Sequence, residues 1–302
     1  MKIVNINKIS DIFDAKRYFE EIIQTAAEKN FLLDLSNATF IKNNYLSIIG
    51  MGLKIVQNRK INVEIKKPKD QKVLQSLNKL NFLPLFCDEI QLVDTYKTMV
   101  RYTNIPLVNN DLKLQEFYMH FMEQFMGKVE NLSPKLQKKI LQKIFELFSN
   151  VFRHSKSHFG LFCSGQFYSK QNKFNFTIVD NGVTIKKNVN DYLSRDFLQK
   201  RSVPDMLKRQ KFRPLDGVNA IKWALKDKHS TTGEGGLGLS LLMELISISK
   251  GSIEIVSGDG YYGIKNAREV SEVLDKPFDG TIISIELNTH SENYYSLKEE
   301  KK

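Results

Sequence analysis

Lys173-Phe-Asn-Phe-Thr-Ile-Val-Asp-Asn-Gly182 is a strand pattern that runs directly into a tight turn. Its apolar residues recur at every second position, which is the period of a strand with one face towards a core. Asp180 stands at the end of this strand, where it can accept a hydrogen bond from an exocyclic amine such as N6 of adenine. Gly182 lets a planar group approach the backbone. Asp-Asn-Gly is also a very common turn, so the neighbouring segments decide between the two interpretations.

An amphipathic helix is predicted before this strand, from Pro134 to about Arg153, with Ser133 as its N-cap. Glu146 and Asn150 are four residues apart, so they share one face of the helix, and Arg153 extends that face. A carboxylate can accept a proton from an attacking water, and an amide oxygen can coordinate Mg²⁺. A guanidinium can pair with phosphate oxygens. Taken alone, the helix also fits a solvated polar face.

A glycine-rich segment, Gly233-Glu-Gly-Gly-Leu-Gly238, leads into an apolar helical pattern later in the chain. Glycines let backbone N–H groups turn towards phosphate, and the start of a helix adds a favourable dipole. No Gly-Lys-Ser/Thr follows, so this is not a Walker loop, and no compact strand leads into it, so it is not a Rossmann turn. Alternating strands are predicted afterwards at 252–256 and 280–287.

The first third of the chain alternates short strands with amphipathic helices. Strands are predicted at 3–6, 31–35 and 61–65, and helices at 10–28, 44–57 and 70–81. Units of this length indicate a mainly parallel or mixed sheet covered by helices, and therefore an α/β class.

The domain organisation follows from where these patterns change. We expect an α/β domain at 1–98, a helical connector at 99–132, and a second domain at 133–290 followed by a polar tail at 291–302. The helix of the connector contains His120, for which a structural role is favoured over that of a phosphoacceptor.

Composition indicates a globular cytoplasmic protein without a membrane span. The hydrophobic share of 41% is sufficient for cores, and no apolar run reaches the length of a transmembrane helix. Cys87 and Cys163 are the only cysteines, which excludes a disulfide framework. The net charge of +11 leaves nucleic acid open as a partner, but acids interleave with the basic residues, so it is not favoured.

The N-terminal domain resembles a STAS domain, the fold of bacterial anti-anti-sigma factors. The resemblance rests on Asp34-Leu-Ser-Asn-Ala-Thr-Phe40, on the helix that begins near Asn44, and on residues 74–85. Phosphorylated members carry a serine before this helix, whereas this chain has Asn43 and Asn44. Because asparagine cannot accept a phosphoryl group, that phosphoswitch is expected to be absent. A plain α/β accessory domain is the alternative.

The C-terminal domain resembles the GHKL ATPase superfamily over about residues 133–290. The resemblance implies the Bergerat fold, an α+β sandwich with a mixed sheet and helices on one face, and it implies ATP and Mg²⁺ as cofactors. The implied roles are Glu146 as general base, Asn150 as the Mg²⁺ ligand, Arg153 near the phosphates, Asp180 with Gly182 at adenine N6, Thr281 at adenine through water, and Thr231, Thr232, Gly233, Gly235, Gly236, Leu237 and Gly238 around the phosphates.

A long basic segment, residues 186–232, lies where this superfamily has its ATP lid. It is interpreted either as a mobile lid or partner surface, or as an insertion with a small core of its own.

Three functions stay open for this combination. The first is an ATP-driven regulatory switch that slowly hydrolyses ATP, with the STAS-like domain or the lid contacting a protein partner. The second is a serine/threonine kinase of the anti-sigma type that acts on a partner in trans. The third is a nucleotide-gated binding module without turnover. A homodimer is left open.

Overall fold

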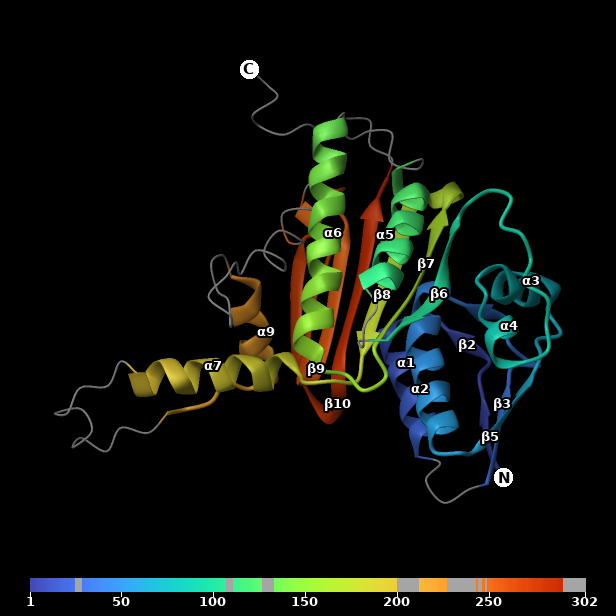
Figure 1. The fold of residues 1–302 in the computed structure, drawn as a ribbon, viewed down its shortest axis with the longest axis horizontal. Helices are drawn as coiled ribbons and strands as arrows, with labels where there is room; N and C mark the ends of the chain where they lie inside the picture. The colour runs from blue at the N-terminus through green and yellow to red at the C-terminus, as the bar shows by residue number, and fades with distance from the viewer. Residues whose placement is uncertain are drawn as a thin grey trace.

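The computed structural model describes residues 1–24, 29–106, 111–126, 133–199, 212–226, 243, 246–247 and 249–289. It shows an α/β protein with two separate main sheets (Figure 1). A three-stranded sheet belongs to the N-terminal unit, residues 1–98, and a five-stranded sheet belongs to the C-terminal unit, residues 99–289. Within the described ranges, no helix has both the length and the apolar composition needed to cross a bilayer.

The N-terminal unit alternates strands and helices as its sequence pattern predicts. Its elements are β1 (Lys2–Asn5), β2 (Lys8–Ile9), α1 (Ile12–Ile23), β3 (Asn30–Asp34), β4 (Phe40–Ile41), the 3-10 turn η1 (Asn43–Tyr45), α2 (Leu46–Asn58), β5 (Asn62–Lys66), α3 (Gln71–Lys79) and α4 (Leu83–Phe86). The strands β1, β3 and β5 pair in parallel in that order, and β2 pairs separately with β4. Aspartates cap two helices: Asp11 accepts from the backbone at α1, and Asp70 does so at α3.

The C-terminal unit is built on a sheet with the strand order β6-β7-β8-β10-β9. Its elements are β6 (Met99–Ile105), α5 (Asp111–Met126), α6 (Pro134–Ser155), β7 (Leu161–Tyr168), the 3-10 turn η2 (Ser169–Gln171), β8 (Lys173–Asp180), α7 (Ile185–Gln199), α9 (Gly217–Leu225), β9 (Ser252–Lys265) and β10 (Arg268–Asn288). The segment expected to be a helical connector thus begins with β6, an edge strand of this sheet.

All neighbouring strands of the five-stranded sheet pair antiparallel, where a mixed sheet was expected. Two of the four pairings, β7 with β8 and β9 with β10, are hairpins, and only antiparallel neighbours can be joined by such a tight turn. Between β9 and β10 this turn consists of Asn266 and Ala267, whose φ values of 50° and 59° fit a two-residue hairpin. The hairpin extends both strands well beyond the predicted ranges 252–256 and 280–287.

The two faces of the five-stranded sheet pack against different helices. One face, called here the α6 face, holds apolar side chains such as Phe176 and Ile178 against α5 and α6. In α5, the ring of Phe121 lies 5.1 Å from that of Phe176. The opposite face, called the α2 face, is covered by α1 and α2 of the N-terminal unit (Figure 1). Helices therefore cover both faces, where the family resemblance implied helices on one.

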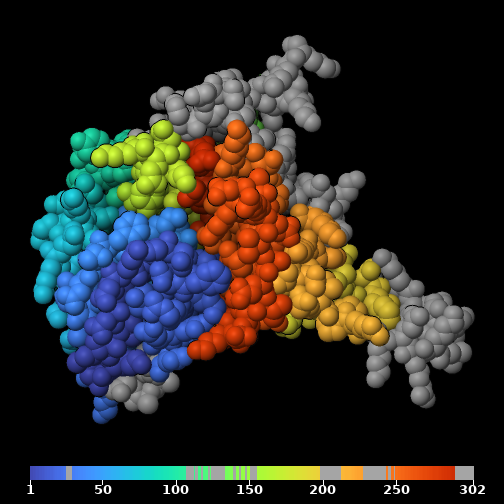
Figure 2. Space-filling model, turned by 180° about the vertical axis from the view of Figure 1, so that it is seen from behind, coloured from blue at the N-terminus to red at the C-terminus, as the bar shows by residue number. Residues whose placement is uncertain are grey.

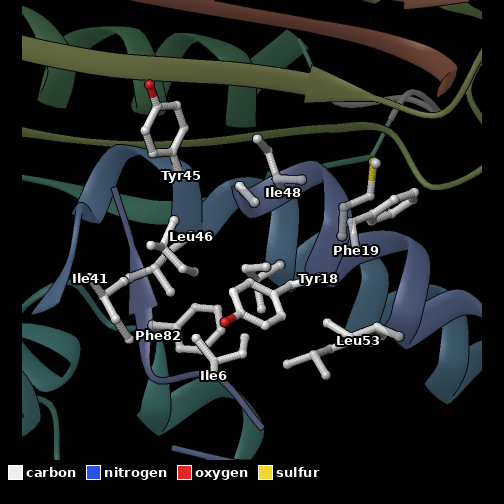
Figure 3. Close-up of a cluster of buried hydrophobic side chains, with 14 of the residues drawn as sticks. Ile6, Tyr18, Phe19, Ile41, Tyr45, Leu46, Ile48, Leu53 and Phe82 are labelled. Carbon is white, nitrogen blue, oxygen red and sulfur yellow. The ribbon is translucent and has the colours of Figure 1, made fainter. Parts of the chain in front are cut away.

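The α2 face and the N-terminal unit share one hydrophobic core. Phe162, Val179, Val256 and Ile282 on the sheet belong to the same buried cluster as the apolar side chains of α1 and α2. Figure 3 shows Tyr45 and Ile48 pointing towards the strands above them, whereas Leu46 points away from the sheet into the N-terminal unit. The two units consequently bury apolar surface against each other as well as within themselves.

A polar row crosses the α2 face beside this apolar patch. Ser164, Thr177 and Ser284 lie directly opposite one another on β7, β8 and β10. Asn44 of the N-terminal unit donates to Thr177 Oγ1 at 2.8 Å and to Ser284 Oγ at 3.2 Å. Tyr45 donates from its hydroxyl to Glu254 Oε2 at 3.2 Å. The turn η1, which leads into α2, is therefore hydrogen-bonded to this row of polar side chains.

The long basic segment between β8 and β9 contains two described helices, α7 and α9. They are held together by a ring contact of 5.6 Å between Tyr192 and Trp223. The backbones of Gly217 and Gly260 touch, since a Cβ added to Gly217 would lie 2.4 Å from the Gly260 nitrogen. Figure 2 shows the red-orange β9–β10 hairpin between the blue N-terminal unit and this gold region. The described part of the segment is thus a small helical insertion on the sheet edge.

Candidate functional site

The helix α6 carries the first group of predicted site residues. Ser133 caps it by accepting from the Leu136 N–H at 3.1 Å, and Pro134 occupies its first turn. The helix ends after Ser155, where Lys156 adopts φ 47°. Its apolar side chains are buried on the α6 face of the sheet, and they include Leu136, Leu141, Ile144 and Phe148. This packing sets the position of α6 along the sheet.

Glu146 lies partly buried near the middle of α6. Gln142 donates from Nε2 to Glu146 Oε1 at 3.3 Å, one helical turn before it. Asn150 and Arg153 lie further along the same helix, and their side chains are outside the described part of the structure. The backbone nevertheless places Asn150 one turn after Glu146, as predicted.

Asp180 ends β8 and faces the same layer as α6. Side chains alternate along a strand, so Asp180 shares the α6 face with Phe176 and Ile178. It is 1% exposed and, among the residues that the structure describes, accepts one hydrogen bond, from the Gly182 N–H at 2.8 Å. Burial away from water raises the pKa of the Asp180 carboxyl to about 7, against the smaller opposite effect of the Gly182 hydrogen bond. A buried carboxyl of this kind is a candidate for binding a donor group.

The turn after Asp180 is fastened to the end of α6. The Val183 N–H donates to the Ser155 carbonyl oxygen at 2.5 Å, and Ser157 Oγ donates to Asn181 Oδ1 at 2.5 Å. A Cβ at Gly182 would lie 1.8 Å from the Ser155 carbonyl oxygen. Position 182 therefore requires glycine because the end of α6 passes so close to its backbone. The sequence suggests a different reason, namely that glycine leaves room for a ligand.

This contact relates Asp180 to the residues predicted on α6. With a rise of 1.5 Å per residue, Asn150 lies about 8 Å and Glu146 about 14 Å along the helix axis from Ser155. The structure therefore brings Asp180 to one end of α6, with Asn150 and then Glu146 progressively farther from it.

Thr281 and Ser257 complete a polar row on the α6 face. Thr281 on β10 lies directly opposite Asp180 on β8 and opposite Ser257 on β9. Thr281 is 6% exposed and Ser257 is fully buried. Their hydroxyl oxygens are 2.9 Å apart, and Ser257 Oγ also accepts from the Ile185 N–H at 2.9 Å. The predicted pair of Asp180 and Thr281 is thus adjacent in the sheet.

Ser257 is not among the site residues that the sequence predicts. The sequence did contain a pattern that could have indicated it. Ile253 and Ile255 point towards the core at alternate positions of the strand, and Ser257 is the next residue on that buried face. Recognising its role required the strand register, since Thr281 is 24 residues away in sequence.

The remaining predicted contacts fall on residues that the structure does not describe. They are Thr231, Thr232, Gly233, Gly235, Gly236, Leu237 and Gly238. Among the described residues, no group of three His, Cys, Asp or Glu side chains could hold a metal ion. A Mg²⁺ bound through Asn150 would therefore draw most of its ligands from phosphate and water, which suits its preference for keeping several waters.

The basic residues of the α7–α9 insertion are partly neutralised by ion pairs. Lys186 contacts Asp259 at 2.7 Å, and Lys222 contacts Glu269 at 2.7 Å. Both acids belong to the β9–β10 hairpin, so these pairs fasten the insertion to the sheet. The pairing lowers the positive charge available for nucleic acid.

Asn43 and Asn44, at the position where the sequence resemblance would place a phosphoacceptor, are buried on the far side of the sheet from Asp180. Asn43 and Asn44 are 2% and 1% exposed, and Ser47 is fully buried. Ser47 donates its hydroxyl to the Asn44 carbonyl oxygen at 3.0 Å. These side chains serve the contact between the units.

Comparison with known proteins adds no relative to this geometry: no protein-family model matches the chain, and no curated protein matches it significantly.

Proposed function

We propose that this chain is an ATP- and Mg²⁺-dependent regulatory switch of the GHKL type that binds ATP and slowly hydrolyses it. The observation that carries the proposal is the buried Asp180 carboxyl, opposite Thr281 and fastened to the end of α6. A carboxylate in this place accepts a hydrogen bond from an exocyclic amine, and adenine N6 offers two such protons.

The direction of α6 supports the placement of the triphosphate. From the adenine end at Asp180, the helix leads first past Asn150 and then to Glu146. Mg²⁺, when bound, would be held by the Asn150 amide oxygen and phosphate oxygens, and it would neutralise phosphate charge. Glu146 would accept a proton from the water whose oxygen bonds to the terminal phosphorus. The bond from that phosphorus to the bridging oxygen breaks, and the products are ADP and phosphate.

The N-terminal unit is the proposed signal or partner module. Large apolar side chains are exposed close together in sequence near its end, namely Leu85 (52%), Ile90 (81%), Val93 (79%) and Tyr96 (76%). Exposed apolar groups gathered in one segment favour contact with another protein. This segment leads directly into β6, the first strand of the five-stranded sheet, and so connects the proposed partner surface to that sheet along the chain.

A protein-serine kinase acting in trans is the second candidate. Glu146 suits activation of a serine hydroxyl as well as of water. Phosphorylation in cis is disfavoured, because Asn43, Asn44 and Ser47 are buried under the α2 face, opposite the face that carries Asp180.

The test combines ATP binding with phosphate release by the full chain. Asp180→Asn should weaken binding of a fluorescent ATP analogue at least tenfold, through loss of a charge-assisted hydrogen bond. Glu146→Gln should preserve binding and reduce phosphate release at least a hundredfold. Glu116→Gln, at an exposed position on α5, is the matched control and should change neither.

Three outcomes separate the alternatives. Unchanged binding by Asp180→Asn would overturn the nucleotide site. Full hydrolysis by Glu146→Gln would reject Glu146 as the base. Transfer of label from γ-labelled ATP to an added STAS-domain protein, in place of release as phosphate, would favour the kinase.

A further inference from the structure

Ser257 stands at the centre of a hydrogen-bonded group beside Asp180. Its Oγ lies 3.0 Å from the Gly280 carbonyl oxygen, 2.9 Å from Thr281 Oγ1, and 2.9 Å from the donating Ile185 nitrogen. The side chain is fully buried, so water does not compete for these contacts. Ser257 thus joins β9, β10 and the first residue of α7.

The single proton of Ser257 determines the direction of every bond in this group. A carbonyl oxygen can only accept, so Ser257 donates its proton to Gly280. The two lone pairs of Ser257 then accept from the Ile185 N–H and from the Thr281 hydroxyl. In this arrangement all four groups are satisfied, as buried polar groups require.

The Thr281 hydroxyl is thereby fixed as a donor to Ser257. The Thr281 oxygen can therefore still accept a hydrogen bond from a group bound beside Asp180. Asp180 is the residue directly opposite Thr281 on the neighbouring strand. Above pH 7 the Asp180 carboxylate also only accepts, and its one hydrogen bond in the described structure comes from Gly182. The two side chains therefore present two acceptors and no donor.

We propose that Ser257, by holding the Thr281 proton, makes this end of the site select adenine over guanine. The inference rests on the proposed function and assigns a specificity-determining residue within it. The adenine amine donates and matches the acceptors, either directly or through a water. The guanine oxygen at the equivalent position only accepts, so it would face two acceptors without a proton between them.

Removal of the Ser257 hydroxyl gives a measurable consequence. Without it, the Thr281 hydroxyl is free to rotate and can donate towards the base. It can then serve a guanine oxygen as well as an adenine amine. We compare the Kd for the guanine nucleotide with the Kd for the adenine nucleotide. Ser257→Ala should lower the ratio of the first to the second about tenfold, which is the change in affinity expected from one hydrogen bond. Thr281→Val, which removes the oxygen, should lower the same ratio.

The experiment is titration of the full chain with fluorescent N-methylanthraniloyl ADP and GDP at pH 8. Ser257→Thr retains the hydroxyl and should keep the wild-type ratio. Ser164→Ala is the matched control, because it removes a buried hydroxyl of the same sheet on the α2 face. It should lower stability and leave the ratio unchanged.

The outcomes distinguish this inference from the proposed function. If the wild-type chain binds neither nucleotide, the proposed function fails and the inference fails with it. If it prefers ADP but Ser257→Ala keeps the wild-type ratio, only the role of Ser257 is overturned. If Ser257→Ala does not fold, a retained ratio in Thr281→Val rejects the inference, and a reduced ratio supports the Thr281 contact on which the inference depends.

Discussion

At the scale of single residues, the surroundings of Asp180 strongly change how its carboxyl ionises. Its carboxyl is 1% exposed and accepts one backbone hydrogen bond within the described residues. Burial penalises the charged form, which raises the pKa to about 7 from the ordinary value of 3.8. A bound amine would favour the charged form, so a ligand would offset this penalty.

The raised pKa predicts how stability depends on pH. The contribution of Asp180 to the free energy of unfolding is fully present below pH 3.8 and is lost as pH rises through about 7. The loss approaches about 1.4 kcal/mol per pH unit within that window. Asp180→Asn cannot ionise and should remove this slope, so the variant should gain stability relative to wild type between pH 5 and pH 8.

Urea denaturation at pH 5, 6, 7 and 8 measures this difference directly. Because other titrating groups are shared by both chains, subtraction isolates Asp180. A wild-type minus variant difference that stays constant with pH would contradict the assigned burial effect.

At the scale of elements, the end of α6 and the turn after β8 form one rigid joint. Gly182 passes so close to the Ser155 carbonyl oxygen that a Cβ would lie 1.8 Å from it. The Val183 N–H donates to the same oxygen. Any displacement of this joint moves Asp180 relative to the helix that carries Glu146.

Gly182→Ala is expected to separate the turn from the helix end. We expect a loss of about 2 kcal/mol or more in the free energy of unfolding, since backbone atoms must move apart. Thermal and urea denaturation measure the loss, and adenine nucleotide binding should weaken with it. Gly258→Ala is the control: the nearest atoms to its Cβ would be those of Thr184, at an ordinary 3.7 Å, so the main cost should be about 1 kcal/mol from the φ of 58°. Equal losses in the two variants would argue against the close contact.

At the scale of the whole molecule, the N-terminal unit and the five-stranded sheet behave as one packed body. Apolar side chains of α1, α2 and the sheet belong to one buried cluster, and Asn44 bridges Thr177 and Ser284. The strands that hold Thr177 and Ser284 also hold Asp180 and Thr281, three residues away on each. The contact between the units and the candidate site thus share two strands.

Asn44→Ala should lower the stability of the entire chain. It removes two hydrogen bonds to buried hydroxyls and leaves a small cavity, which together cost about 2 kcal/mol. Trp223 is the single tryptophan, and it lies on α9, far in sequence from Asn44. Its fluorescence therefore reports unfolding of the insertion. Fluorescence and far-ultraviolet circular dichroism should shift together. Asn58→Ala, exposed at the end of the helix α2 that follows η1, should change stability by less than about 0.5 kcal/mol. An early separate transition seen only by circular dichroism would show that the units unfold independently.

The sequence alone determined the local structure of this protein. Alternation at 173–179 predicted β8, the Ser133–Pro134 start predicted α6, and helical periodicity predicted α1, α2 and α3. These patterns are local because strand and helix periods reflect which side of a short segment meets the core. The neighbouring pair Asp180 and Thr281 was also proposed from sequence, although only through the family resemblance.

The tertiary structure decided what lies on each side of the five-stranded sheet. The strand β6, the antiparallel order, the cover of α1 and α2, and the role of Ser257 all depend on pairing between residues far apart in the chain. Ser257 and Ser164 both lie on strands of alternating pattern, and the sequence does not distinguish their environments. Ser257 contacts Thr281 on the α6 face, whereas Ser164 contacts Asn44 on the α2 face. Only the register, fixed by hydrogen bonds across several strands, selects the partner and therefore the chemistry.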